Sequence, residues 1–129
     1  MSEDVIAAII RKQRKLLILY HNKLQLYTIP LGKVNIGETP HDALLREMKE
    51  ELDIEVTSCS KVGKANIIIE ERDITFHIFD IYSYNGTIVN NEPHKHNEML
   101  WNSLSQLIKL HKENKMDKVT TLCMQQGLI

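Results

Sequence analysis

The chain has 129 residues and a formal net charge of -1 at pH 7, with 43% hydrophobic and 26% charged residues. This length suits one domain with a buried core, and we expect a single domain over residues 1–129. The near-zero charge argues against a polyanion-binding protein, because no basic surplus exists to neutralise many phosphates. We therefore expect no stable nucleic acid partner.

Targeting signals and a disulfide framework are not expected either. No apolar run reaches about 18 residues, which argues against a transmembrane helix and a membrane partner. Residues 1–20 lack the charged and unbroken apolar segments of a signal peptide. Cys59 and Cys123 are the two cysteines, and we expect reduced thiols in a cytoplasmic protein. One optional bridge between them is the alternative.

The first part of the chain predicts three strands. Residues 5–10 (VIAAII) and 15–20 (KLLILY) are short runs of β-branched residues and leucine. The charged residues 11–14 between them indicate a turn, which would pair the two strands. Residues 24–29 (LQLYTI) predict a third strand that ends at Pro30.

The rest of the chain predicts two helices and three more strands. The pattern predicts a helix over 40–52, followed by strands over 64–70 and 74–84 that flank a polar turn at 71–73. Asn85-Gly86 indicates a turn after the second of these strands, and a short strand is expected over 99–101. Ser103 and Ser105 are candidate helix caps, and a second helix is expected over 113–126. Because strands outnumber helices, we expect an α+β (mixed α/β) fold with a sheet packed by helices.

The predicted helix over 40–52 has a clear start and two distinct faces. Thr39 suits the N-cap, and Pro40 suits the first helical position. At 100° per residue, one side carries the apolar positions Leu44, Leu45, Met48 and Leu52 and is expected to be buried. A different side carries three carboxylates at i, i+3 and i+4, namely Glu47, Glu50 and Glu51.

This acidic face predicts a metal site. Like charges three and four residues apart destabilise a helix, and a hard divalent cation with oxygen ligands, such as Mg²⁺, reverses that effect. Arg46 can pair with Glu50 one turn later. The alternative is a solvated acidic face balanced by Arg46 and Lys49.

The segment around this helix resembles the Nudix box, the signature of the Nudix hydrolases. That pattern is G-x5-E-x7-R-E-U-x-E-E-x-G-U, where U is aliphatic. Gly32, Glu38, Arg46-Glu47, Met48, Glu50-Glu51 and Ile54 occupy its fixed positions. Asp53 stands where the family has glycine, and a left-handed conformation there would cost some stability. Leu31-Gly32 stands where the family often has Gly-Gly, so the loop backbone can differ there.

The resemblance implies a Nudix fold, in which a mixed β-sheet lies between helices. It implies hydrolysis of nucleoside diphosphates linked to another group X, with Mg²⁺ or Mn²⁺. Glu47, Glu50 and Glu51 match metal-ligand positions, and the Leu31 carbonyl matches a backbone ligand of some members. Glu47, Glu50 or a glutamate outside the box would help to activate water. Arg46 matches a residue that orients the catalytic glutamate, and Glu38 one that supports the loop.

Residues outside the box would determine the substrate. The segment 92–101, EPHKHNEMLW, is similar to one in MutT-type members, and Glu98 within it is a candidate extra metal ligand or base. The alternative for Glu98 is a solvated charge at a strand edge. His94 and His96 could contact a base or phosphate, although surface histidines are the more common case.

Three more residues are candidate substrate contacts. Tyr27 could stack on a base, although aromatic residues at such positions more often belong to the core. Lys33 and Arg11 could contact phosphate, and Lys33 is the better candidate because it lies inside the box. A solvated turn charge is the alternative for both.

The expected function is therefore that of a MutT-type nucleoside triphosphate pyrophosphohydrolase, releasing a nucleoside monophosphate and pyrophosphate. Hydrolysis of ADP-ribose, a nucleotide sugar or a dinucleoside polyphosphate is the second hypothesis. A nucleotide-sensing module without activity is the third, although no box glutamate is lost. The partner is a small nucleotide, and the protein is expected to be a monomer or homodimer.

Overall fold

The computed structural model describes residues 2–129 and has the expected mixed α+β architecture. Its elements, in chain order, are β1 (Ser2–Lys12), β2 (Lys15–His21), β3 (Leu26–Thr28), β4 (Leu31–Lys33), α1 (Pro40–Leu52), β5 (Glu55–Ile69), β6 (Arg72–Asn85), β7 (His96–Asn102), α2 (Leu104–Lys112) and α3 (Lys118–Gln125). None of the helices in this described part is long and apolar enough to cross a membrane.

β1 is the central strand. It pairs in parallel with β6, from Ser2↔Asp73 to Ile10↔Ile81, and antiparallel with β4. β6 also pairs with β5, while β2 pairs with β3 and β7. The predicted pairing of the first two strands is confirmed only beside their turn, at Arg11↔Leu16 and Lys12↔Lys15. β1 is buried on both faces and has β4 and β6 at its edges, so only its end remains for β2.

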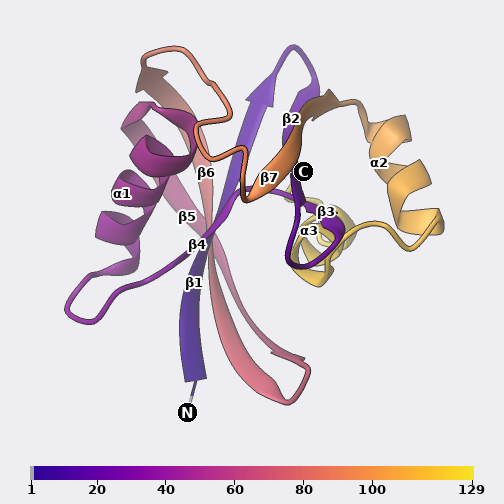
Figure 1. The fold of residues 1–129 in the computed structure, drawn as a ribbon, viewed down its shortest axis with the longest axis horizontal. Helices are drawn as coiled ribbons and strands as arrows, with labels where there is room; N and C mark the ends of the chain where they lie inside the picture. The colour runs from indigo at the N-terminus through magenta and orange to yellow at the C-terminus, as the bar shows by residue number, and fades with distance from the viewer. Residues whose placement is uncertain (1) are drawn as a thin grey trace.

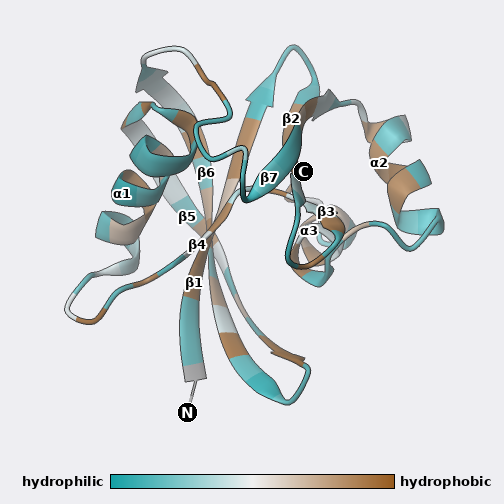
Figure 2. Cartoon of the chain, viewed as in Figure 1, coloured by the Kyte–Doolittle hydropathy of each residue, from teal (hydrophilic) through white to brown (hydrophobic). Residues whose placement is uncertain are grey.

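Two apolar clusters lie on opposite faces of β1. Ile6, Ala8 and Ile10 pack toward α1, whereas Ala7 and Ile9 pack toward α3 and Leu107 of α2. Figure 1 shows α1 on one side of the strands and α2 and α3 on the other, and Figure 2 shows hydrophobic residues along the middle of β1. Cys59 and Cys123 are both free and belong to different clusters, so no bridge joins them.

Several element boundaries differ from those expected. The third strand ends before Pro30 as expected, but Leu31–Lys33 forms a further strand, β4, and β5 begins at Glu55 rather than residue 64. β5 lies at the edge of the sheet and pairs only with β6. Its first half carries many exposed polar residues, so the sequence there lacks the apolar pattern that would predict a strand. The C-terminal segment forms α2, capped by Ser103 and not Ser105, and α3, capped by Asp117.

Candidate active site

The box helix α1 begins and ends as its sequence predicts. Thr39 is the N-cap, and its hydroxyl accepts a hydrogen bond from the Asp42 backbone N–H at 3.1 Å. Asp53 ends the helix in the left-handed conformation, with φ 56° and ψ 41°. Its carboxylate pairs with the Lys49 ammonium group at 2.8 Å. One detail of the expected core is wrong, because Leu45 is half-buried while Ala43 is fully buried.

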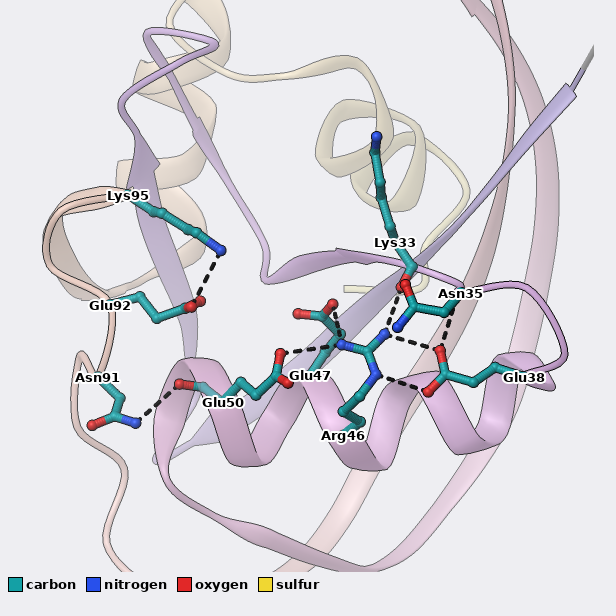
Figure 3. Close-up of polar contacts among 9 residues, drawn as sticks. All are labelled: Lys33, Asn35, Glu38, Arg46, Glu47, Glu50, Asn91, Glu92 and Lys95. Carbon is teal, nitrogen blue, oxygen red and sulfur yellow. Dashed lines mark hydrogen bonds and ion pairs between the residues drawn. The ribbon is translucent and has the colours of Figure 1, made fainter.

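Arg46 joins the carboxylates of the box to one another. Its Nε and Nη2 groups donate to the two Glu38 oxygens at 2.7 and 2.9 Å, and Nη2 also donates to the Lys33 carbonyl at 2.8 Å. Nη1 donates to Glu47 at 2.9 Å and to Glu50 at 3.1 Å. All five guanidinium N–H groups are therefore used, and Figure 3 shows Arg46 between the three glutamates.

Glu38 anchors the loop that precedes α1. Its side chain also accepts a hydrogen bond from the Asn35 backbone N–H at 2.9 Å. The bonds from Arg46, and then that from Asn35, lower the pKa of Glu38 to about 2. Glu38 is thus a carboxylate that supports the loop and orients Arg46, which is the supporting position expected from the sequence.

Glu47 lies between Arg46 and the backbone of β4. A Cβ atom placed on Gly32 would lie 2.3 Å from the Glu47 Cδ atom, so only glycine leaves room for this carboxylate. Burial raises the pKa of Glu47, although the bond from Arg46 opposes that shift. The box therefore fixes one partly desolvated carboxylate against β4 by a close backbone approach.

Glu51 is the most deeply buried carboxylate of the site, with 2% relative exposure. Neither of its carboxylate oxygens has a hydrogen-bond partner among residues 2–129. Burial, followed by the charge of Glu47, raises the pKa of Glu51 well above its ordinary value. A buried carboxyl group without partners is unfavourable by itself, so the protein carries a cost at this position.

His96 lies beside Glu51 and differs from the expected surface histidine. It has 4% relative exposure, and its Nε2 atom is 3.8 Å from the Glu51 Oε1 atom. Burial lowers the pKa of His96 to about 4. Strict alternation along β7 would put His96 on the face opposite Met99 and Trp101, so its burial beside α1 follows from the register shift between Tyr20 and His21 in the β2–β7 pairing, which the sequence does not signal.

The donor set fits a divalent cation with oxygen ligands. Within residues 2–129, no three histidine, cysteine or carboxylate side chains converge closely enough to form a ready metal cage. The unpartnered Glu51 oxygens lie next to Glu47, however, and Gly32 of β4 adjoins the Glu47 side chain. Mg²⁺ binds through one or two protein carboxylates plus water and substrate phosphates, so it needs no closed cage.

The loop between β6 and β7 brings further charges to this side of α1. The Asn91 backbone N–H donates to the Glu51 carbonyl at 2.8 Å, and its side-chain amide donates to the Glu50 carbonyl at 3.0 Å. Glu92 and Lys95 form an ion pair at 3.2 Å and extend toward the box glutamates (Figure 3). Both residues belong to the segment 92–101 that was expected to bear on the substrate, but no role was expected for either one, because their placement depends on contacts between distant segments.

Four of the predicted site residues lie apart from the box carboxylates. The Lys33 side chain points away from them and lies 3.8 Å from Glu3 (Figure 3). Arg11 binds Asp80 at 2.7 Å and lies four residues beyond Ala7, the last residue of β1 that pairs with β4, a distance of about 13 Å along the strand. These two placements give no support to phosphate contacts.

Tyr27 and Glu98, the other two, form a hydrogen bond with each other. The Tyr27 hydroxyl donates to the Glu98 carboxylate at 2.6 Å, and this bond, with burial, raises the pKa of Tyr27 to about 12. Met99 faces α1, so the alternating side chain of Glu98 lies on the opposite face of β7. The expected role of Glu98 as a metal ligand therefore conflicts with its position.

Comparisons with known proteins agree with the fold and the box. The chain is 29% identical over 110 residues to the CTP pyrophosphohydrolase of Escherichia coli (strain K12), covering 82% of this chain and 79% of that protein. It is 40% identical over 53 residues to the 8-oxo-dGTP diphosphatase of Proteus vulgaris, covering 41% and 47% of the two chains.

A solved structure shows the same fold. The MutT NUDIX hydrolase from Burkholderia pseudomallei superimposes with a TM-score of 0.76 at 20% identity, covering 81% of this chain and 85% of that one. The NUDIX domain family itself matches residues 2–123, nearly the whole chain. The protein therefore belongs to the Nudix family and is a hydrolase of the nucleotide pyrophosphohydrolase type.

Proposed function

We propose that the protein is a MutT-type pyrophosphohydrolase, which cleaves a nucleoside triphosphate to a nucleoside monophosphate and pyrophosphate. The observation that carries this proposal is the buried Glu51 carboxylate without partners, next to Glu47, which Arg46 and Gly32 hold in place. Pyrophosphohydrolase activity on CTP, named for the Escherichia coli relative, supports a triphosphate substrate.

Nudix hydrolases generally use divalent metal ions, and we propose Mg²⁺, or Mn²⁺, for this one. Glu47, Glu50, Glu51 and the Leu31 carbonyl would hold the metal. When bound, the metal supplies positive charge that neutralises phosphate oxygens and polarises the bond to be broken. The acidic face of α1 would otherwise repel the substrate.

The side chains of the site then have separate tasks. Glu47 or Glu50 accepts the proton of the attacking water, because both carboxylates are oriented by the Arg46 guanidinium group. Arg46 is itself fixed by Glu38, which keeps the carboxylates at their positions through the reaction. Attack occurs between the α and β phosphorus atoms, and positioning with charge neutralisation supplies most of the rate.

A substrate panel tests this proposal. CTP, dCTP, 8-oxo-dGTP and ADP-ribose would be incubated with Mg²⁺ and with Mn²⁺, and monophosphate, pyrophosphate and phosphate would be measured. Glu50→Gln should lower turnover at least tenfold, about 1.4 kcal/mol in the barrier, whereas Glu70→Gln in the exposed β5–β6 turn should not.

Two results would contradict the proposal at different levels. Much faster turnover of ADP-ribose than of every triphosphate would reject the MutT-type substrate. Tight binding of a triphosphate without cleavage by either metal would favour a nucleotide-sensing role instead.

A further inference from the structure

The loop that carries Lys95 is fastened to the same residues that form the acidic face. The Val89 backbone N–H donates to the Leu52 carbonyl at 3.1 Å, and Asn91 donates to the carbonyls of Glu51 and Glu50 at 2.8 and 3.0 Å. These bonds satisfy carbonyls in the last turn of α1, which have no partner within the helix. The loop therefore keeps a fixed position relative to the box carboxylates.

The backbone of Lys95 is held by hydrogen bonds on both sides, whereas its side chain is exposed. Its N–H donates to the Glu92 carbonyl at 2.9 Å, and its carbonyl accepts a hydrogen bond from the Asn22 N–H at 2.9 Å. The Asn22 side chain also donates to the His94 carbonyl at 3.0 Å. The Lys95 side chain is 58% exposed, so its ammonium group can turn about a fixed anchor.

The side chain of Lys95 extends to Glu92 on the side of α1 that carries Glu47 and Glu50 (Figure 3). Its hydrogen bond to Glu92 is the main cause of its raised pKa, and the charges of Glu47 and Glu51 contribute to the same shift. Among residues 2–129, the ion pair of Lys95 is with Glu92 and with no box carboxylate. The Lys95 ammonium group therefore lies beside the acidic face of α1 but forms no ion pair with its three glutamates.

We propose that Lys95 is a substrate-binding residue whose ammonium group turns from Glu92 to an oxygen of the substrate's polyphosphate chain. This inference rests on the proposed function, since it requires a polyphosphate at the box carboxylates. Because the Lys95 side chain is 58% exposed, a phosphate oxygen can reach its ammonium group, and that contact would replace the one with Glu92, whose side chain is 17% exposed. The lysine would act as a point charge for phosphate, a role that suits its compact ammonium group.

Two opposite effects on binding test the inference. Calorimetry would measure Mg²⁺ alone, and then α,β-methylene-CTP in the presence of Mg²⁺, with wild type and Lys95→Gln. We expect the variant to bind the nucleotide about tenfold more weakly, and to bind Mg²⁺ alone at least as tightly, because a nearby positive charge is removed. With CTP, KM should rise more than kcat falls, and Lys95→Arg should recover part of the affinity.

Lys115→Gln is the matched control, because the Lys115 side chain is also 58% exposed and forms an ion pair, with Glu113 at 3.3 Å. It should change neither titration. Equal nucleotide affinity of wild type and Lys95→Gln would overturn the inference, and so would parallel losses of nucleotide and Mg²⁺ affinity, which would indicate a structural role. If wild type binds and cleaves no nucleotide, the proposed function itself fails, and the inference fails with it.

Discussion

The side chain of Glu47 packs so closely against the backbone of Gly32 that position 32 has no room for a side chain. A Cβ atom on Gly32 would stand 2.3 Å from both Cγ and Cδ of Glu47. On its other side, Glu47 is held by Arg46 at 2.9 Å. A side chain at position 32 would therefore push the Glu47 carboxylate out of the position in which it accepts the Arg46 bond.

Gly32→Ala should consequently displace Glu47 and lower kcat/KM at least tenfold, about 1.4 kcal/mol. Gly63→Ala is the matched control, because a Cβ atom there would meet Ile78 at an ordinary 3.5 Å. Steady-state kinetics and melting temperatures of both variants check this expectation. Full activity of Gly32→Ala would show that Glu47 can move without loss of function.

Local sequence signals predicted the part of the site that lies on one helix. Thr39, Pro40 and Asp53 define the ends of α1, and the spacing of Glu47, Glu50 and Glu51 places them on neighbouring positions of that helix. The burial of Glu51 was not predictable, because it depends on the packing of β7 and the preceding loop against α1. The spacing of residues along the sequence gives no information on which distant segments meet.

The same limit applies to the candidate residues outside the box. Glu98 lies in β7 and Lys95 in the loop before it, and the register of β7 determines which face of the strand Glu98 occupies. The register shift between Tyr20 and His21 in the β2–β7 pairing lets both His96 and Met99 face the α1 side. Glu98 consequently meets Tyr27 on the other face, while Lys95 remains beside the box.

Glu51→Gln should separate stability from metal binding. The variant removes a buried carboxyl group that has no hydrogen-bond partner among the described residues, so the metal-free protein should melt at a higher temperature than wild type. The rise in melting temperature that Mg²⁺ gives the wild type should be largely lost. Glu50→Gln is the comparison, since the Glu50 side chain is 51% exposed and its loss should change metal-free stability little. A metal-free protein destabilised by Glu51→Gln would contradict this account.

Asp53→Gly should stabilise the protein while leaving its activity nearly unchanged. The left-handed conformation of Asp53, with φ 56°, is more favourable for glycine. The substitution also removes the exposed ion pair with Lys49, which offsets part of the gain. We expect a net increase of about 0.5 kcal/mol in the free energy of unfolding, measured by urea titration. A decrease would show that the Lys49 pair outweighs the backbone strain.

Asp117, the N-cap of α3, should make stability depend on pH. It has 5% relative exposure, and burial raises its pKa from 3.8 to about 6. Because the folded state holds the proton more tightly, this group favours folding most below about pH 3.8, and that contribution is lost as the pH rises to about 6. Asn keeps the cap and cannot ionise.

Asp117→Asn should therefore stabilise the protein by about 1.4 kcal/mol more at pH 8 than at pH 5, which is roughly half of the difference of about 3 kcal/mol between the two fully titrated limits. Denaturant titrations of wild type and variant across this range measure the difference. Asp42→Asn, the same exchange at an exposed position in the first turn of α1, reports any effect of the amide itself. A stability difference between Asp117→Asn and wild type that stays constant with pH would mean that Asp117 remains ionised in the folded protein throughout, because its hydrogen bonds to the α3 backbone outweigh its burial.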